Sequence, residues 1–250
     1  MEKIELREET QSFSLETTPV KLFCDSADVK TVLQMASQPY IKGFTTNPTL
    51  MRKAGVTDYA TFAQQLLERI TDRPVSFEVL SDEFDEMERQ AQLISSWGTN
   101  IYVKIPVTNT KGAPSYHLVE RLAQSGVKVN VTAVFTLAHV RKLCAALRGG
   151  ADSIVSIFAG RIADAGIDPV PVMAEARNIL DMACPNAELL WASPREVLNL
   201  VQAEQARCDI ITATQDILNK LHLLNKDLDE FSLETVQMFY RDALAAGYEL

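Results

Sequence analysis

The sequence has little of what metal centres and membrane spans require. It contains three histidines, and its four cysteines (Cys24, Cys144, Cys184 and Cys208) are widely spaced without a C-x-x-C pair, so no zinc site is indicated. We expect reduced core thiols. No stretch approaches the ~20 apolar residues of a transmembrane helix, and residues 1–18 are polar and acidic without the apolar region of a signal peptide. These absences favour a cytoplasmic protein that does not bind a membrane.

Two further absences argue against particular ligands. Acidic residues outnumber basic ones by 33 to 24, and the resulting net charge of -9 opposes nucleic-acid binding, which usually needs a basic face. Any phosphate must therefore be held by local cations. The first apolar run, Lys21–Asp25, is followed by Ser26-Ala27-Asp28 and not by a glycine-rich loop, so dinucleotide binding is not expected.

Short apolar runs alternate with amphipathic segments along most of the chain. Eight runs are expected to be strands: Lys21–Asp25, Gly43–Asn47, Val75–Leu80, Ile101–Val107, Val127–Phe135, Ser153–Gly160, Leu189–Ser193 and Asp209–Thr214. Six segments between them have helical spacing: Asp58–Ile70, Glu83–Trp97, Tyr116–Gln124, Leu137–Leu147, Val170–Met182 and Arg195–Ala206. This alternation predicts an α/β fold, a single (β/α)8 TIM barrel, in preference to an open doubly wound sheet.

Two segments fall outside the predicted barrel, although we expect residues 1–250 to form one domain. Residues 1–18 are a polar extension. Within residues 228–250, a C-terminal helix is predicted over Ser232–Ala246 with Ser232 as its N-cap. One face of this helix is apolar: Leu233, Val236, Phe239, Tyr240, Ala243 and Leu244. That face needs a partner, and the chain's own barrel and a neighbouring subunit are equally favoured.

Lys104 lies within the apolar run Ile101–Val107, which is typical of a buried strand. An ammonium group is costly to bury unless it loses its proton or finds a partner. Desolvation lowers the pKa of a lysine, and a neutral amine is a nucleophile toward carbonyl carbons. Lys104 is therefore a candidate for Schiff-base formation. Considered alone, it could equally lie at a strand end with its amine in solvent.

Polar residues end or follow most of the predicted strands. They are Asp25, Thr45, Thr46, Asn47, Glu78, Lys104, Asn130, Thr132, Ser156, Arg161, Ser193 and Arg195. Asn130 and Thr132 are two residues apart and so share a face of their strand, as do Ser156 and Phe158. Because (β/α)8 barrels place functional residues at the carboxyl ends of the strands, we expect these side chains to meet at one mouth.

The two arginines follow successive strands, in the part of a barrel where phosphate sites often form. Two guanidinium groups can hold a phosphate in fork geometry, and Ser193 adds a hydroxyl group. Alternatives stay open for single residues. Either arginine could pair with a surface carboxylate, Asp25 and Ser193 could only cap helices, and residues 45–49 could only form a turn.

Several of these residues lie in motifs that resemble one known family. The motifs are Phe-Cys-Asp-Ser-Ala around Asp25, Thr-Thr-Asn-Pro-Thr-Leu from Thr45, Val-Lys-Ile-Pro around Lys104, Asn-Val-Thr from Asn130, Phe-Ala-Gly-Arg-Ile from Phe158 and Ala-Ser-Pro-Arg before Glu196. Over roughly Lys21 to Leu221 the chain resembles the transaldolase family, which includes the fructose-6-phosphate aldolases. The resemblance implies class I aldol chemistry on a (β/α)8 barrel, without a metal or another cofactor, in the pentose phosphate pathway.

The resemblance also implies catalytic roles. Lys104 matches the lysine that forms the Schiff base, and Asp25 matches the group that takes the proton of the C4 hydroxyl during cleavage. Glu78 and Thr132 match the pair that holds a catalytic water for the proton transfers around carbinolamine formation.

The same comparison implies a set of substrate-binding residues, with sugar phosphates as substrates. For the dihydroxyacetone part and its surroundings these are Thr46, Asn47, Asn130, Ser156 and Phe158, and for the phosphate they are Arg161, Ser193 and Arg195. Pro194 departs from the bulky residue expected between Ser193 and Arg195.

Two residues favour the transferase branch of the family. Fructose-6-phosphate aldolases resemble one another in having glutamine at the position of Glu78. They tend to have tyrosine at the position of Phe158. A length of 250 residues is closer to the short aldolase-like branch, but short transaldolases exist, so residue identity decides. We therefore predict a transaldolase. The alternatives are an aldolase that releases dihydroxyacetone and a non-catalytic sugar-phosphate-binding barrel. The physiological sugars, including sulfonated ones, stay open, and a homo-oligomer of unspecified size is expected.

Overall fold

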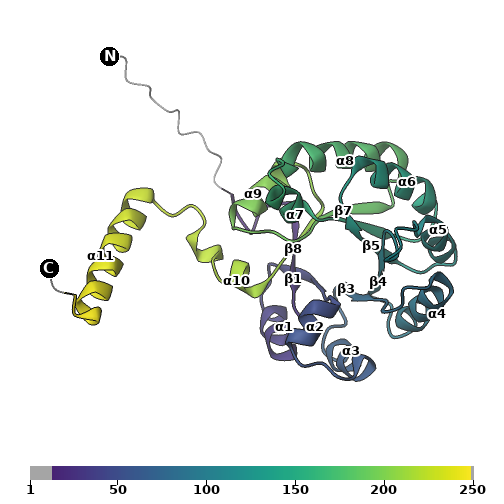
Figure 1. The fold of residues 1–250 in the computed structure, drawn as a ribbon, viewed down its shortest axis with the longest axis horizontal. Helices are drawn as coiled ribbons and strands as arrows, with labels where there is room; N and C mark the ends of the chain where they lie inside the picture. Colours follow the sequence, from purple (N-terminus) through teal and green to yellow (C-terminus); the bar gives the residue numbers. More distant parts are fainter. Residues whose placement is uncertain (1–12, 249–250) are drawn as a thin grey trace, which may run out of the picture.

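The computed structural model describes residues 13–248. Eight parallel strands form a closed barrel in chain order (Figure 1). They are β1 (Lys21–Asp25), β2 (Ile41–Thr45), β3 (Val75–Glu78), β4 (Ile101–Pro106), β5 (Val129–Val134), β6 (Ser153–Ile157), β7 (Ala187–Trp191) and β8 (Ile210–Ala213). The prediction of a (β/α)8 barrel is confirmed.

Helices join the strands and surround the barrel, and further helical elements follow β8 (Figure 1). They are α1 (Val29–Ala36), α2 (Pro48–Lys53), α3 (Tyr59–Leu67), α4 (Phe84–Ser95), α5 (Tyr116–Gln124), α6 (Leu137–Leu147), α7 (Ala159–Asp164), α8 (Pro169–Ala183), α9 (Leu198–Gln205), α10 (Gln215–Leu218), a 3-10 turn η1 (Leu221–Leu223) and α11 (Leu228–Ala246). Among these described residues, no helix has the length and apolar character needed to cross a membrane.

Two of the predicted strands were too long because a helix begins directly after each of them. The second run was expected to reach Asn47, but β2 ends at Thr45 because the Asn47 side chain caps α2, accepting a hydrogen bond from the Leu50 amide at 3.0 Å. The sixth run was expected to reach Gly160, but β6 ends at Ile157 because α7 begins at Ala159. Both errors fall where a strand passes directly into a helix, so the functional residues there lie on short helices.

An apolar cluster fills the lower interior of the barrel. Phe23, Ile154, Leu190 and Ile210 are its largest members, and each is almost fully buried. Gly43 makes room for it, since a Cβ atom there would lie 2.5 Å from the Phe23 ring. The polar residues of the barrel interior therefore lie on a layer of buried apolar side chains.

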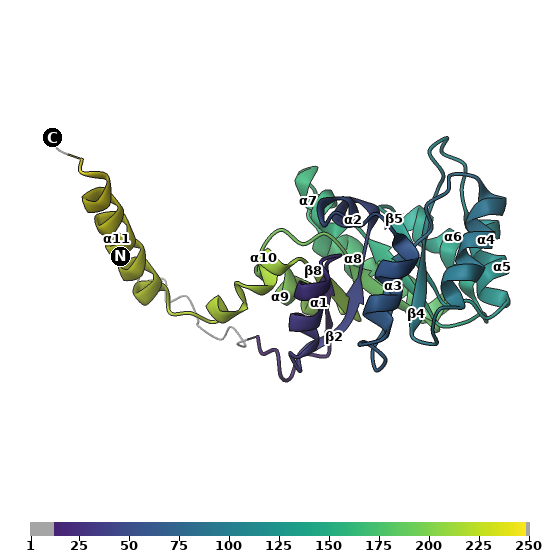
Figure 2. The same ribbon diagram turned by 90° about the horizontal axis from the view of Figure 1, so that it is seen from below.

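The C-terminal helix differs from its prediction in two respects. It begins at Leu228 instead of Ser232, because Asp227 is the N-cap and its side chain accepts a hydrogen bond from the Glu230 amide at 2.9 Å. No residue of α11 is buried, and the helix lies away from the barrel (Figure 2). Of the two alternatives for its apolar face, packing on the chain's own barrel is therefore wrong.

Only the last part of the predicted N-terminal extension lies within the described residues, which exclude residues 1–12. Phe13 is buried, and its carbonyl oxygen accepts a hydrogen bond from the Asn225 side chain at 2.8 Å. This contact joins the segment before β1 to the segment that leads into α11.

Candidate active site

A cavity of about 480 Å³ opens at the carboxyl ends of the strands. Its lining includes ten of the predicted site residues: Asp25, Asn47, Glu78, Lys104, Asn130, Thr132, Ser156, Phe158, Arg161 and Ser193. Thr46 and Arg195 are the predicted site residues that do not line it. The structure thus brings most of the predicted set together at one mouth.

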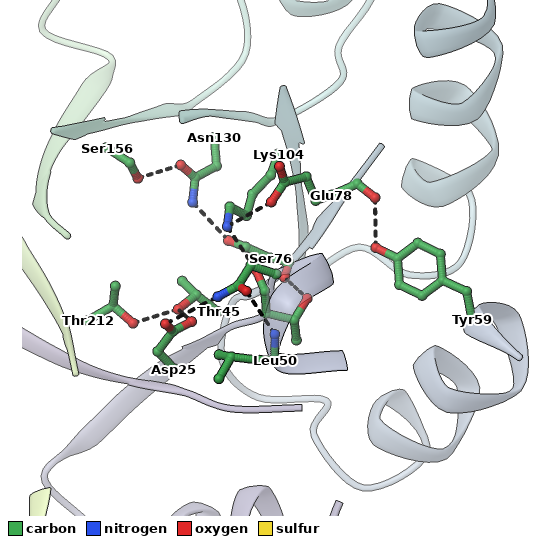
Figure 3. Close-up of polar contacts among 12 residues, drawn as sticks. Asp25, Thr45, Leu50, Tyr59, Ser76, Glu78, Lys104, Asn130, Ser156 and Thr212 are labelled. Atoms are coloured by element: carbon green, nitrogen blue, oxygen red, sulfur yellow. Dashed lines mark hydrogen bonds and ion pairs between the residues drawn. The ribbon is translucent and has the colours of Figure 1, made fainter. Parts of the chain in front are cut away.

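Lys104 lies inside the barrel with only 6% of its surface exposed. Its Nζ donates to the carbonyl oxygen of Thr46 at 2.8 Å and lies 3.1 Å from Oε2 of Glu78 (Figure 3). Glu78 and Lys104 are partners in the pairing of β3 with β4, so strand register alone places the carboxylate beside the amine. The alternative of a strand-end lysine with its amine in solvent is wrong.

Thr46 supports the lysine instead of lining the cavity. It is fully buried, and its hydroxyl donates to the carbonyl oxygen of Ser76 at 2.9 Å while its own carbonyl oxygen accepts from Lys104. The predicted contact between Thr46 and substrate is therefore not supported by its position. Because the acceptor for Lys104 is a main-chain oxygen, the side-chain pattern gave no sign of this role.

Asp25 ends β1 and faces the cavity half-buried. Its carboxylate accepts hydrogen bonds from the Thr45 hydroxyl at 2.7 Å and from the Asn47 amide group at 3.4 Å (Figure 3). Burial raises the pKa of Asp25 above its usual range, although the positive charge of Lys104 opposes the shift. The alternative that Asp25 caps α1 is wrong, because Asp28 is that cap.

A second polar chain crosses the barrel beside Lys104. Ser156 donates to the Asn130 side-chain oxygen at 2.6 Å, and the Asn130 amide group donates to the Ser76 hydroxyl at 3.1 Å (Figure 3). The sequence analysis did not identify Ser76, although its position two residues before Glu78 in an apolar strand was an available signal. These bonds orient the Asn130 amide group at the cavity wall.

Of the expected pair of arginines, Arg161 lines the cavity and Arg195 does not. Arg161 lines the cavity, with its guanidinium 5.5 Å from the centre of the Phe158 ring. Arg195 instead forms an ion pair with Asp164, in which Nε lies 2.9 Å from Oδ1. The structure thus shows the surface-carboxylate alternative for Arg195 and leaves Arg161 as the arginine of the cavity lining.

A close backbone approach places Arg161 and Ser193 at the same mouth. A Cβ atom on Gly160 would lie 1.5 Å from the Ser193 carbonyl oxygen, so only glycine lets α7 begin against the loop after β7. Ser193 itself has a φ of 62°. A non-glycine residue in this conformation is strained, and such strain often occurs at functional sites.

The assembled groups fit carbonyl chemistry. A buried primary amine can add to a carbonyl carbon, and carboxylates near it can exchange protons with the amine and with substrate hydroxyl groups. Within residues 13–248, no three histidine, cysteine, aspartate or glutamate side chains lie close enough together to hold a metal ion.

Comparison with known proteins agrees with this chemistry. The model of the transaldolase/fructose-6-phosphate aldolase family matches residues 22–249. The chain belongs to this family. Relatives named "probable transaldolase" include a protein of Chelativorans sp., 34% identical over 85% of this chain and 94% of its own length, and one of Hyphomonas neptunium, 32% identical over 92% and 100%. Another, of Dehalococcoides mccartyi, is 31% identical over 81% of this chain and 90% of its own length.

A solved structure shares the fold of this family member. A putative phosphonomutase from Burkholderia cenocepacia superimposes with a TM-score of 0.52 over 94% of this chain and 96% of its own, at 14% sequence identity. At that identity the likeness concerns the fold alone. The family match confirms the resemblance found in the sequence motifs.

Proposed function

We propose that this member of the family is a transaldolase. It transfers a dihydroxyacetone unit from a ketose phosphate, such as fructose 6-phosphate or sedoheptulose 7-phosphate, to an aldose phosphate through a Schiff base on Lys104. We assign it to the pentose phosphate pathway in the cytoplasm. The main support is the buried Lys104 amine, which lines the cavity between a main-chain acceptor and the Glu78 carboxylate.

The first half of the reaction forms the covalent intermediate. Glu78 lies 3.1 Å from Nζ, where its carboxylate can accept the proton that the ammonium group loses before attack on the ketose carbonyl. Addition gives a carbinolamine, and loss of water gives the iminium. Thr132, buried in the cavity lining, is our candidate to hold the water that carries these protons together with Glu78.

The second half breaks the bond between C3 and C4. The iminium accepts the electron pair of that bond, while Asp25 removes the proton of the C4 hydroxyl so that the leaving fragment becomes an aldehyde. Burial raises the pKa of Asp25, which makes its carboxylate a stronger base than an exposed aspartate. The enamine that stays on Lys104 then attacks an acceptor aldehyde by the reverse steps.

The phosphate would be held by Arg161, with the Ser193 hydroxyl beside it. Arg161→Ala is expected to raise KM for fructose 6-phosphate by about 10- to 100-fold, because a charged hydrogen bond contributes roughly 1.5–3 kcal/mol. Arg195→Ala is the matched control and should change KM less than about threefold, because Arg195 is held by Asp164 in an exposed pair. Initial rates measured over a range of donor concentrations test both. Equal losses in the two variants would contradict the assignment to Arg161 alone.

Phe158 supports transfer over aldol cleavage. Its ring lines the cavity and stacks on Phe135 at 5.7 Å, and it carries no hydroxyl group that could deliver a proton to the enamine. Phe158→Tyr is expected to raise release of free dihydroxyacetone about 10²-fold, the lower end of the usual range for general acid catalysis. The measurement is dihydroxyacetone release from fructose 6-phosphate without an acceptor, compared between the variant and the native protein. If the enzyme is an aldolase, the native rate is already high and this substitution changes it little.

Trapping the intermediate tests the proposal directly. The protein is incubated with fructose 6-phosphate and borohydride, and its intact mass is measured. We expect a mass gain that matches one reduced dihydroxyacetone unit, and addition of an aldose phosphate should reduce the yield of adduct. A folded protein that gives no adduct with any ketose phosphate would favour the non-catalytic sugar-phosphate-binding barrel.

The C-terminal helix supports a homo-oligomer. Phe231, Val236, Phe239, Tyr240 and Leu244 are all exposed on α11 in the single chain. Apolar side chains at this density on a surface mark an interaction site. We therefore propose that α11 packs against a second copy of the chain.

A further inference from the structure

A chain of two hydroxyl groups leads to Asp25 from the two strands that flank β1. Thr45 on β2 donates to Oδ1 of Asp25 at 2.7 Å, and the Thr212 hydroxyl lies 2.5 Å from the Thr45 hydroxyl (Figure 3). The strand β1 pairs with β2 on one side and with β8 on the other, so Thr45 and Thr212 meet inside the barrel over β1. Both threonines are more than nine-tenths buried.

The number of protons fixes the direction of this chain. An ionised carboxylate can only accept hydrogen bonds, so Thr45 must donate its single hydroxyl proton to Asp25. The remaining bond between the two threonines must then be donated by Thr212. Donation by Thr212 polarises the Thr45 hydroxyl and strengthens its bond to the carboxylate.

We propose that Thr212 is a positioning residue that acts through Thr45 to keep Asp25 charged and oriented as the base for cleavage. This inference rests on the proposed function. Oδ2 of Asp25 has only the longer contact with Asn47, so it is the oxygen that takes the proton. In that step the proton of the C4 hydroxyl moves to Oδ2, and the electron pair of the broken O–H bond forms the C=O bond of the leaving aldehyde. The electron pair between C3 and C4 moves to the iminium and gives the enamine. The Thr45 and Thr212 bonds keep their direction throughout.

Other charged groups face Asp25, and Thr212 variants leave them in place. The positive charge of Lys104 lowers the pKa of Asp25 and the negative charge of Glu78 raises it. Cys24 is the adjoining titratable residue, and burial raises its pKa to about 12, so its thiol stays neutral in the working range. A change in the acid limb of the rate profile on altering Thr212 therefore reports the hydroxyl chain.

The test compares Thr212→Val, Thr212→Ser and a matched control, Thr31→Val. Thr31→Val also removes a partly buried hydrogen bond, which the Thr31 hydroxyl donates to Oε1 of Gln215 at 3.0 Å. This bond lies beside the same strands but outside the barrel. In Thr212→Val, loss of the donated bond raises the pKa of Asp25, so the acid limb of kcat/KM for fructose 6-phosphate should move up by about 0.5 pH unit. In Thr212→Ser and Thr31→Val it should stay at the wild-type position.

Trapping of dihydroxyacetone separates failure of this inference from failure of the proposed function. Dihydroxyacetone has no C4, so its adduct with Lys104 under borohydride does not need Asp25, and Thr212→Val should trap it at the wild-type rate. If wild type traps no dihydroxyacetone, the Schiff-base proposal fails and the inference fails with it. If wild type traps it but Thr212→Val and Thr31→Val have the same acid limb, the inference alone is overturned. Should the valine variant fold poorly by thermal melting, Thr212→Ala replaces it with the same expected shift.

Discussion

Lys104→Met is expected to reduce transfer from fructose 6-phosphate by at least about 10³-fold and to abolish the borohydride adduct, because removal of a covalent nucleophile disables the whole group that acts with it. Methionine is similar in length to lysine and has no amine. It also suits the site sterically, since Lys104 is buried on a strand whose neighbours Val103 and Ile105 are fully buried. The measurements are the initial rate of aldose-phosphate-dependent transfer and the intact mass after reduction.

The matched control for this variant is Lys128→Met. Lys128 precedes the neighbouring strand β5, and its exposed amine donates to the Thr99 carbonyl oxygen at 3.2 Å, outside the cavity. The control should keep wild-type activity and adduct yield. Circular dichroism should show that Lys104→Met is folded, although Glu78 loses its ion pair. An adduct of wild-type yield in this variant would place the Schiff base on a different lysine.

The sequence was sufficient to predict the lining of the cavity wherever a polar side chain interrupts a buried strand. Lys104 and Asn130 both lie in apolar strands, where burial of a polar side chain without a hydrogen-bonding or charged partner is costly. The pairing of neighbouring strands then brings such residues together, as it does for Lys104 and Asn130 themselves. The barrel and most of its mouth follow from these two rules.

Other contacts depended on the folded arrangement. Arg195 pairs with Asp164 because of where α7 ends relative to the loop after β7. No local sequence pattern encodes that arrangement. In the sequence, Thr212 is an ordinary β-branched strand residue. Its contact with Thr45 arises only because β8 pairs with β1 in the folded barrel. The position of α11 was equally hidden, because an apolar helical face predicts contact with a partner without identifying it.

Asp25→Asn is expected to lower the cleavage rate of fructose 6-phosphate by about 10²- to 10⁴-fold, the usual range for loss of a general base. Asparagine keeps the shape of the side chain and can still accept the Thr45 hydrogen bond, but its amide cannot take the proton of the C4 hydroxyl. Reduction of the dihydroxyacetone adduct on Lys104 should proceed at the wild-type rate. A parallel loss of adduct formation would show that Asp25 is needed before cleavage.

The same substitution should not reduce the stability of the fold at neutral pH. The pKa of Asp25 is raised in the folded protein above its usual value of 3.8, mainly by burial, so the folded state holds this proton more tightly than the unfolded state does. Stability therefore falls as pH rises from that value through the raised pKa, and at neutral pH the charged carboxylate opposes folding. Asparagine removes this charge, and we expect denaturant unfolding at pH 7 to give a free energy of unfolding at least equal to that of wild type.

A clear loss of stability would mean that the charge of Asp25 holds Lys104 in place, so that one ion network supports both the fold and the chemistry. Equal or greater stability with lost cleavage would instead show that the charge is retained for catalysis at the expense of the fold.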